Sequence, residues 1–169
     1  MLVISDTTPI ISLMKAEKLE LLQKMFETVI VPDAVYYELT ENPLYSTEAS
    51  QIISCSFIHK EKVDNEEAVH ILRKVTGLDV GESEAIVMID EKKADLLLMD
   101  EHKGRQIAKK MGITITGTVG ILIQAFDENM LRKDEVCDCL EKLRESNVRI
   151  SESLYNLVLE HMDKKKSIN

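Results

Sequence analysis

The chain has 169 residues, of which 44% are hydrophobic, and this length and composition predict one compact domain with a buried core. A formal net charge of −9 at pH 7 excludes a broad basic surface that holds long nucleic acid by charge alone, so any polyanion has to be captured locally. Three cysteines without a CxxC pair argue against a disulfide framework and a thiolate zinc site, and no stretch reaches the ~18 apolar residues of a membrane span, so we expect a soluble, unprocessed, cytoplasmic protein.

Short apolar runs alternate along the chain with segments of helical periodicity. In chain order, the patterns predict a strand at 2–5, a helix at 9–26, a strand at 28–32, a helix at 33–40, a strand at 55–63, helices at 65–75 and 82–92, a strand at 94–99, a helix at 102–111, a strand at 113–116, and helices at 119–127, 133–145 and 151–164. Such alternation specifies a central parallel sheet with helices on both faces, which is a three-layer α/β/α sandwich, followed here by C-terminal helices.

Two of the predicted strands end in a carboxylate just before a helix. Asp6 follows the strand at 2–5, and Asp100 follows the strand at 94–99. Ligands of open α/β sheets bind beyond the carboxyl ends of the strands, where neighbouring helices go to opposite faces, and we expect these two acids to meet there. Carboxylates at close range repel unless they share a proton or bind a cation, and we favour the cation. The alternative for Asp6 alone is an N-cap of the following helix.

Glu38 and Glu82 are expected to join these two acids. Glu38 lies in the helix after the second strand, and Glu82 lies in the first turn of the helix that leads to Asp100. Each has a simpler explanation by itself, because Glu38 could be a solvated surface acid and Glu82 could oppose the helix dipole. Four carboxylates without a nearby His or Cys would suit Mg²⁺ or Mn²⁺ and would suit zinc poorly. The four histidines show no i, i+4 ligand spacing; they are His59, His70, His102 and His161.

Three segments carry a family resemblance: ISDTTPII (4–11), VIVPDAVYYEL (29–39) and LDVGESEAIVMIDEKKADLLLMDEHKGRQIAKKMGITITGTVGIL (78–122). They resemble the PIN-domain family, in particular short prokaryotic PIN proteins related to VapC-type toxins. The resemblance implies a PIN-like nuclease domain over residues 1–130 and a metal-dependent endoribonuclease that cuts RNA with Mg²⁺ or Mn²⁺. It also implies a catalytic and metal-binding quartet formed by Asp6, Glu38, Glu82 and Asp100.

The resemblance leaves the third acid open. Glu82 stands where many relatives have Asp, and Glu84 lies two residues further along the same turn. Thr7 and Thr8 match the small hydroxyl residues that follow the first Asp in the family and support a ligand or a water molecule there. Thr118, in the glycine-containing turn after the strand at 113–116, is expected to point toward the acidic corner, although that turn matches neither GxGxxG nor a P-loop.

The segment after Asp100 is the candidate for contacts with RNA phosphates. His102, Lys103 and Arg105 lie at the start of a predicted helix, where basic side chains and amides can hold a phosphate. An ordinary amphipathic helix with its charges in water explains them equally well.

Residues 131–169 are expected to form a helical extension that packs on the domain or on a dimer partner. Its last helix has an apolar stripe of Leu154, Leu157, Val158 and Met162, which fits either arrangement. VapC-type relatives often form homodimers and are often inhibited by a small antitoxin, so both partners are open by analogy.

Two other functions remain open at this point. A PIN scaffold with a weak site could bind RNA or a protein without cutting it. The sequence SDTTP also fits the start of a haloacid-dehalogenase-like phosphatase, in which Asp6 would be the nucleophile. That scheme usually needs a general acid at position 8, which is Thr here, and it leaves Glu38 and Glu82 without a role.

Overall fold

Five short strands form one sheet in which every neighbouring pair is parallel. In the computed structural model, which describes residues 1–166, the order across the sheet is β3 (Ile58–Glu61), β2 (Val29–Pro32), β1 (Val3–Ser5), β4 (Leu96–Leu98) and β5 (Ile115–Thr116). The chain therefore winds outward from β1 to β3 and then returns to add β4 and β5 on the other side of β1. The direction of winding switches between β1 and β4, which is where open α/β sheets bind ligands.

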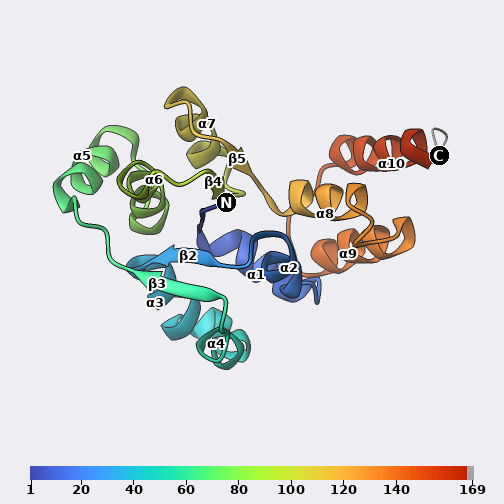
Figure 1. Cartoon of the computed structure of the whole chain (residues 1–169), viewed down its shortest axis with the longest axis horizontal. Coiled ribbons are helices and arrows are strands. Elements are labelled where there is room, and N and C mark those ends of the chain that lie inside the picture. Colours follow the sequence, from blue (N-terminus) through green and yellow to red (C-terminus); the bar gives the residue numbers. More distant parts are fainter. Residues whose placement is uncertain (167–169) are drawn as a thin grey trace.

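In the described part of the chain, ten α-helices surround the sheet (Figure 1). They are α1 (Thr7–Lys15), α2 (Glu20–Phe26), α3 (Asp33–Glu41), α4 (Ser46–Ile53), α5 (Glu66–Thr76), α6 (Val80–Lys92), α7 (His102–Lys110), α8 (Thr118–Asp127), α9 (Lys133–Glu145) and α10 (Glu152–Lys166), and a short 3-10 helix, η1 (Pro43–Tyr45), precedes α4. Helices α8, α9 and α10 lie together at one end of the molecule, opposite α5 (Figure 1). Within the described residues, no helix has the length and apolar character that crossing a bilayer requires.

Successive residues of a strand belong to two separate hydrophobic cores, one on each face of the sheet. This arrangement confirms the predicted three-layer sandwich. Val3 packs with apolar residues of α1 to α4 and α8 to α10, whereas its neighbour Ile4 packs with those of α5, α6 and α7. The same alternation holds in β2 and β4. Because side chains of a strand point alternately to its two faces, an uninterrupted apolar run is what a sheet covered on both sides requires.

The predicted helix at 9–26 is wrong as a single element. The structure breaks it after Lys15 and starts α2 at Glu20, with Glu17 in the left-handed region at a φ of 56°. No Gly or Pro marks this turn in the sequence, and the apolar residues continue through it, since Leu19 is buried as well. Helix α4 was not predicted either, and Ile52 is the only residue of it that the structure buries.

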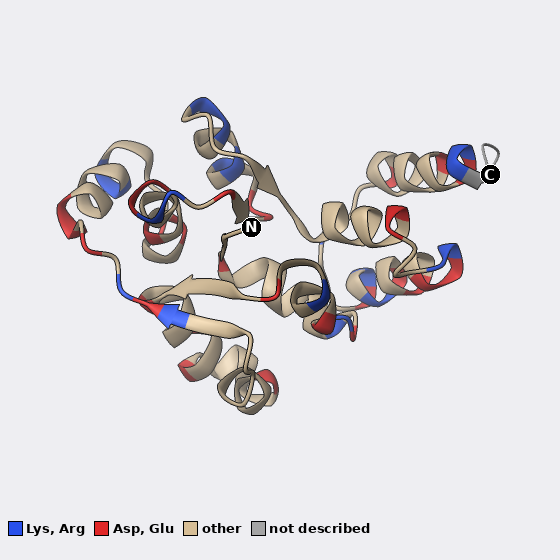
Figure 2. Cartoon of the chain, in the orientation of Figure 1, with Lys and Arg blue, Asp and Glu red and all other residues tan. Residues whose placement is uncertain are grey.

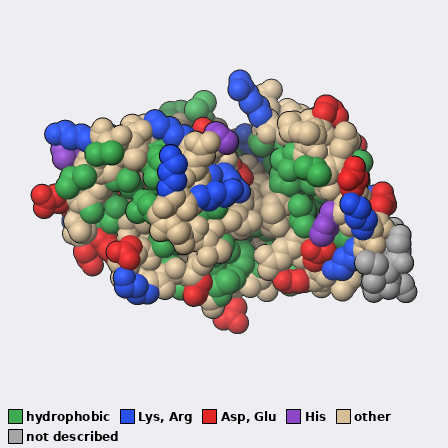
Figure 3. All heavy atoms as spheres, turned by 90° about the horizontal axis from the view of Figure 1, so that it is seen from above, with side chains coloured by type: hydrophobic (Ala, Val, Ile, Leu, Met, Phe, Trp, Pro, Cys, Tyr) green, Lys and Arg blue, Asp and Glu red, His purple; other side chains and the backbone are tan. Residues whose placement is uncertain are grey.

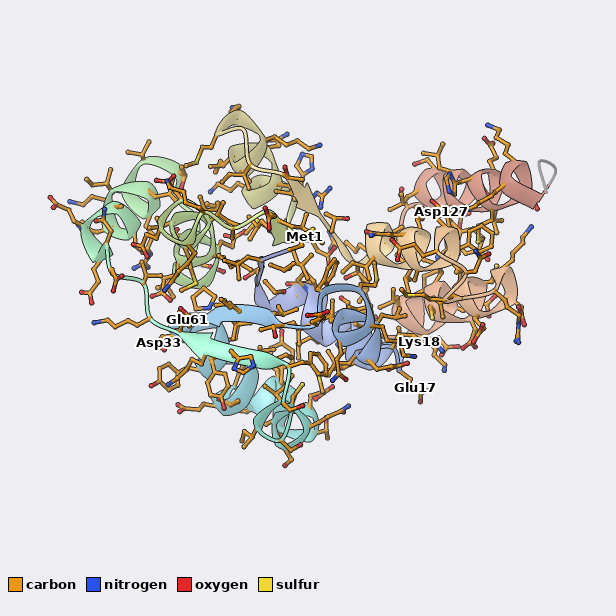
Figure 4. All side chains as sticks on the ribbon, in the orientation of Figure 1. Met1, Glu17, Lys18, Asp33, Glu61 and Asp127 are labelled. Carbon is orange, nitrogen blue, oxygen red and sulfur yellow. The ribbon has the colours of Figure 1, made fainter. Side chains whose placement is uncertain are left out.

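The C-terminal helices share the core of the α1 side. Leu140 and Leu143 of α9 and Met162 of α10 are fully buried in the same cluster as residues of α1, α2 and α8. The turn after α1 is tied to α9 by ion pairs, in which Glu17 meets Lys142 at 2.6 Å and Lys18 meets Glu135 at 3.8 Å; Figure 4 labels Glu17 and Lys18 in this turn. Segment 131–166 therefore packs on the rest of the chain, while the boundary at residue 130 stays a prediction.

Candidate active site

Asp6 is a buried carboxylate at the carboxyl end of β1, beside the winding switch. It occupies the N-cap position of α1 but makes no capping hydrogen bond through its side chain, and only 5% of it is exposed. Burial raises the pKa of Asp6 to about 7; the Thr7 amide opposes that rise, and the negative charges of Asp79, Glu82 and Glu38 add to it. Helix capping therefore does not explain why an acid stands here.

A cavity of about 340 Å³ opens above Asp6. Its lining consists of Asp6, Thr7, Thr8, Glu38, Gly77, Asp79, Glu82, Glu101 and Lys103, and we call this the acidic pocket. The structure thus brings three of the four predicted acids, Asp6, Glu38 and Glu82, to one cavity. Two further acids, Asp79 and Glu101, were not singled out from the sequence.

Glu38 is oriented by a threonine of another helix. It lies on α3, and its Oε2 accepts a hydrogen bond of 2.6 Å from the Thr7 hydroxyl at the start of α1. Thr7 is buried, whereas Thr8 is exposed on the wall of the pocket. The first of the two threonines after Asp6 is therefore the one that holds a neighbouring acid in place.

Glu82 is held by one carboxylate oxygen and leaves the other without a partner. Its Oε2 accepts from the Asp79 amide (3.1 Å), and Asp79 Oδ1 accepts from the Glu82 amide (2.8 Å), which is a capping box at the start of α6. Glu82 Oε1 is buried and accepts no hydrogen bond from any residue between 1 and 166. Burial raises the pKa of Glu82; the Asp79 amide and Lys103 oppose the rise, and the charges of Asp79 and Glu101 add to it. An Asp three residues before a Glu at the start of a helix is a pattern typical of a capping box. This spacing of Asp79 and Glu82 could have singled out Asp79 from the sequence.

Glu84 points away from the acidic pocket although it lies on the same turn as Glu82. Its Oε2 accepts a hydrogen bond of 3.0 Å from the Ala34 amide in the first turn of α3, and it lines a different cavity together with Asp33 and His70. Burial raises the pKa of Glu84, and the Ala34 bond opposes that rise. Of the two neighbouring glutamates, only Glu82 faces the pocket.

Asp100 lies next to the acidic pocket without lining it. Both of its oxygens bind Thr118 at the start of α8, Oδ1 accepting from the amide (2.8 Å) and Oδ2 from the hydroxyl (2.5 Å). It lines a neighbouring cavity of about 380 Å³, which also contains Arg105. The fourth predicted acid therefore does not line the cavity of the other three and is engaged with Thr118.

The pocket matches a hard divalent cation in donor chemistry. Its acids offer only oxygen ligands, no His or Cys lines it, and the unpartnered Glu82 Oε1 leaves a buried negative atom uncompensated, which is costly without a counter-charge. Across residues 1–166, no three acidic, His or Cys side chains stand close enough together to enclose an ion as they are placed. The residues fit Mg²⁺ or Mn²⁺, and closure around either ion requires side-chain movement.

The predicted phosphate-binding residues lie on both sides of the start of α7. Lys103 lines the acidic pocket, and its ammonium donates to the Gly77 carbonyl at 2.8 Å. Arg105 faces the neighbouring cavity and donates from Nη1 to the Met99 carbonyl at 2.7 Å. His102 is exposed, with its ring 2.9 Å from the Gln106 amide nitrogen. Helix α7 carries Lys and Arg but no acidic residue (Figure 2).

Replacing Gly117 by Ala is expected to disable the site without touching any of the acids. An added Cβ would overlap Asp100 Oδ1 and would lie 3.1 Å from Arg105 Nη1 and 3.3 Å from the Met99 carbonyl oxygen. Asp100 would have to leave Thr118, so we expect the rate of any reaction at this site that depends on Asp100 to fall by roughly 10²-fold, the effect of a displacement of about 1 Å in an active site. Gly112→Ala is a control for a general loss of stability, because an alanine is strained at the Gly112 φ of 76° while nothing lies within 4 Å of the added Cβ. Equal activity of the two variants would separate Asp100 from catalysis.

A parallel α/β sandwich with carboxylates at the ends of neighbouring strands has the architecture of a protein that binds its ligand where the winding switches. A family model described as PIN domain matches residues 2–164, so the chain belongs to the PIN-domain family. Members of this family are in general nucleases that bind RNA and typically depend on a divalent metal. Searches of curated proteins and of solved structures gave no significant match.

Proposed function

We propose that this protein is a metal-dependent endoribonuclease that hydrolyses RNA phosphodiester bonds with Mg²⁺ or Mn²⁺. The supporting observation is the acidic pocket itself, in which a buried Asp6 and a Glu82 with an unpartnered buried oxygen share one cavity with Glu38. Two buried carboxylates with raised pKa values and no ion-pair partner are costly in a purely structural role. A cation between them would remove that cost.

In this proposal Asp6, Glu38 and Glu82 hold the cation, and Asp100 is the fourth ligand. When bound, the cation supplies positive charge that neutralises the substrate phosphate and stabilises the charge developing in the transition state. Thr7 orients Glu38, Thr118 orients Asp100, and the Asp79 amide fixes one oxygen of Glu82. Lys103 at the pocket wall offers a cation to the incoming phosphate.

The matched variants Glu82→Gln and Glu84→Gln test this proposal. They remove the same charge from the same helix, but only Glu82 faces the pocket, so we expect Glu82→Gln to lose Mn²⁺ uptake in calorimetry and to lower RNA cleavage by at least 10²-fold. Glu84→Gln should retain both. Cleavage by the wild type should stop on chelation and return with Mg²⁺ or Mn²⁺. Chelator-resistant cleavage, or equal loss in both variants, would contradict the proposal.

The alternatives give different results in the same experiments. A scaffold that only binds RNA or protein would be folded and would neither take up metal nor cut RNA. Membership of the PIN-domain family disfavours a haloacid-dehalogenase-like phosphatase. The roles of a toxin with an antitoxin partner, of a homodimer and of a cytoplasmic protein stay predictions. The three free cysteines, Cys55, Cys137 and Cys139, suit a reducing compartment.

A further inference from the structure

One acid of the acidic pocket, Asp79, carries a charge that its structural role does not require. Asp79 is the N-cap of α6, and its Oδ1 accepts a hydrogen bond of 2.8 Å from the Glu82 amide. Ser or Asn accepts such a bond equally well without a charge. The helix dipole favours an acid at this end of α6, but Glu82 in the first turn already provides one. The charge of Asp79 therefore adds repulsion to a pocket in which Asp6 is already buried.

Asp79 and Asp6 converge beside Gly81. A methyl group placed on Gly81 would lie 3.6 Å from Asp79 Oδ1 and 3.7 Å from Asp6 Oδ1. Of the neighbouring charges that raise the pKa of Asp6, the charge of Asp79 is the largest, ahead of those of Glu82 and Glu38. No Lys, Arg or His between residues 1 and 166 forms an ion pair with Asp79. Two carboxylates placed in this way repel each other unless a cation lies between them.

The second carboxylate oxygen of Asp79 is available to an ion. Asp79 is exposed in the lining of the acidic pocket, and its Oδ2 accepts no hydrogen bond from the described residues. Asp100 differs from it, since both oxygens of Asp100 accept hydrogen bonds from Thr118 and its side chain lines the neighbouring cavity. In the pocket itself, Asp79 therefore offers an oxygen that Asp100 does not.

The acids of the pocket are a local group and not part of a broad acidic surface. The first turn of α7 borders the pocket, where Lys103 belongs to its lining. On the side of the molecule that carries α7, Lys and Arg side chains gather near the middle, and most acidic side chains lie toward the rim (Figure 3). An ordinary solvated acidic face therefore does not explain why Asp79 stands beside Asp6.

We propose that Asp79 supplies a further carboxylate ligand to the divalent cation of the acidic pocket through Oδ2, while Oδ1 keeps capping α6. This inference rests on the proposed function and deepens it by adding a ligand outside the predicted quartet. Asp79 and Glu82 hold each other by two hydrogen bonds from amide to carboxylate, of 3.1 Å and 2.8 Å. The first turn of α6 therefore presents both ligands as one rigid unit.

Asn and Ser at position 79 separate a ligand from a helix cap, because both cap a helix about as well as Asp but carry no charge. Mn²⁺ titrated calorimetrically into full-length Asp79→Asn and Asp79→Ser should bind at least about tenfold more weakly than to the wild type, since the charge of its ligands sets the affinity of an oxygen site. In EDTA, both variants should unfold at no lower urea concentration than the wild type. Asp79→Ala, which also removes the cap, should unfold earlier.

Glu101→Gln is the matched control for the charge of the pocket. Glu101 lines the same cavity, is exposed, and makes no capping hydrogen bond through its side chain at the start of α7. Its loss removes one negative charge from the pocket without removing a proposed ligand. At physiological salt, which screens charges that do not touch the ion, Mn²⁺ affinity should fall by less than about threefold.

The outcomes separate the role of Asp79 from the proposed function. Wild-type Mn²⁺ affinity in Asp79→Asn and Asp79→Ser would overturn the ligand role and leave the nuclease proposal standing. Equal losses in these variants and in Glu101→Gln would overturn it as well, since charge alone would then account for them. A loss confined to one of the two substitutions at position 79 would assign the effect to local packing and have the same consequence. Absence of Mn²⁺ binding by the wild type would overturn both proposals.

Discussion

The Asp6→Asn variant is expected to lose RNA cleavage and at the same time to gain stability at neutral and alkaline pH. Asn has nearly the same shape but carries no charge, so it cannot serve as an anionic ligand, and it removes the cost of burying an ionised carboxylate. Burial and neighbouring acids raise the pKa of Asp6 from 3.8 to about 7. At about 1.4 kcal/mol per pKa unit, ionised Asp6 lowers the free energy of unfolding by on the order of 4 kcal/mol when no cation is bound.

The pH dependence of this effect has a definite direction. The folded protein keeps its proton on Asp6 up to about pH 7, whereas the unfolded chain releases it near pH 3.8. The folded state therefore holds more protons between these values, and the contribution of Asp6 to the free energy of unfolding falls as the pH rises through that window. Asp6→Asn should lack this decline, and the two proteins should be closest in stability below about pH 4.

Urea unfolding in EDTA at pH 5, 6, 7 and 8 measures the difference. Adding Mg²⁺ or Mn²⁺ at pH 8 should stabilise the wild type, because the ion binds only the folded protein, and should leave Asp6→Asn unchanged. Asp90→Asn is the matched control, since Asp90 is 86% exposed and its surface pair with Lys93 contributes little. An Asp6→Asn variant that is less stable than the wild type at pH 8 would contradict the prediction. It would show that ionised Asp6 stabilises the fold without a cation, and the free-energy cost of burying its charge would no longer support the proposed site.

Truncation of Leu140 to Ala is expected to destabilise the whole chain by about 2–5 kcal/mol. Leu140 lies on α9 and is fully buried in the cluster that also contains Leu13 of α1 and Leu122 of α8. The cavity left by the missing methyl groups would therefore lie in the core beneath the sheet and not in a separate C-terminal unit. Unfolding should remain a single transition with a lower midpoint when circular dichroism is followed in urea.

The control for Leu140→Ala is Glu141→Ala, the exposed neighbour on the same helix, which should change stability by less than about 0.5 kcal/mol. Two separate transitions in Leu140→Ala, with the first confined to part of the helical signal, would mean that residues 131–169 unfold independently. The experiment thus tests whether the C-terminal helices unfold together with the rest of the PIN-like domain. It requires no assumption about catalysis.

Local patterns were sufficient for the layers of the fold because each strand is short, apolar and followed by an amphipathic helix. The predicted helix at 133–145 matches α9 residue for residue, since its buried positions Val136, Cys139, Leu140 and Leu143 repeat at helical spacing. The break at Glu17 could not be predicted in this way. Helix α1 ends there in a local left-handed turn at Glu17, in which the Lys18 amide donates to the Leu13 carbonyl at 2.8 Å, and such turns are usually marked in a sequence by Gly or Asn.

The sequence by itself determined that carboxylates stand at the ends of β1 and β4, because an acid after an apolar run is a local feature. Only the tertiary structure decided which acids share a cavity. Glu82 and Glu84 are nearly equivalent in sequence, yet the helical turn directs Glu82 toward Asp6 and Glu84 toward the Ala34 amide. In the same way, Thr118 engages Asp100 from 18 residues away. Side-chain direction depends on helix rotation and packing, which no spacing along the chain specifies.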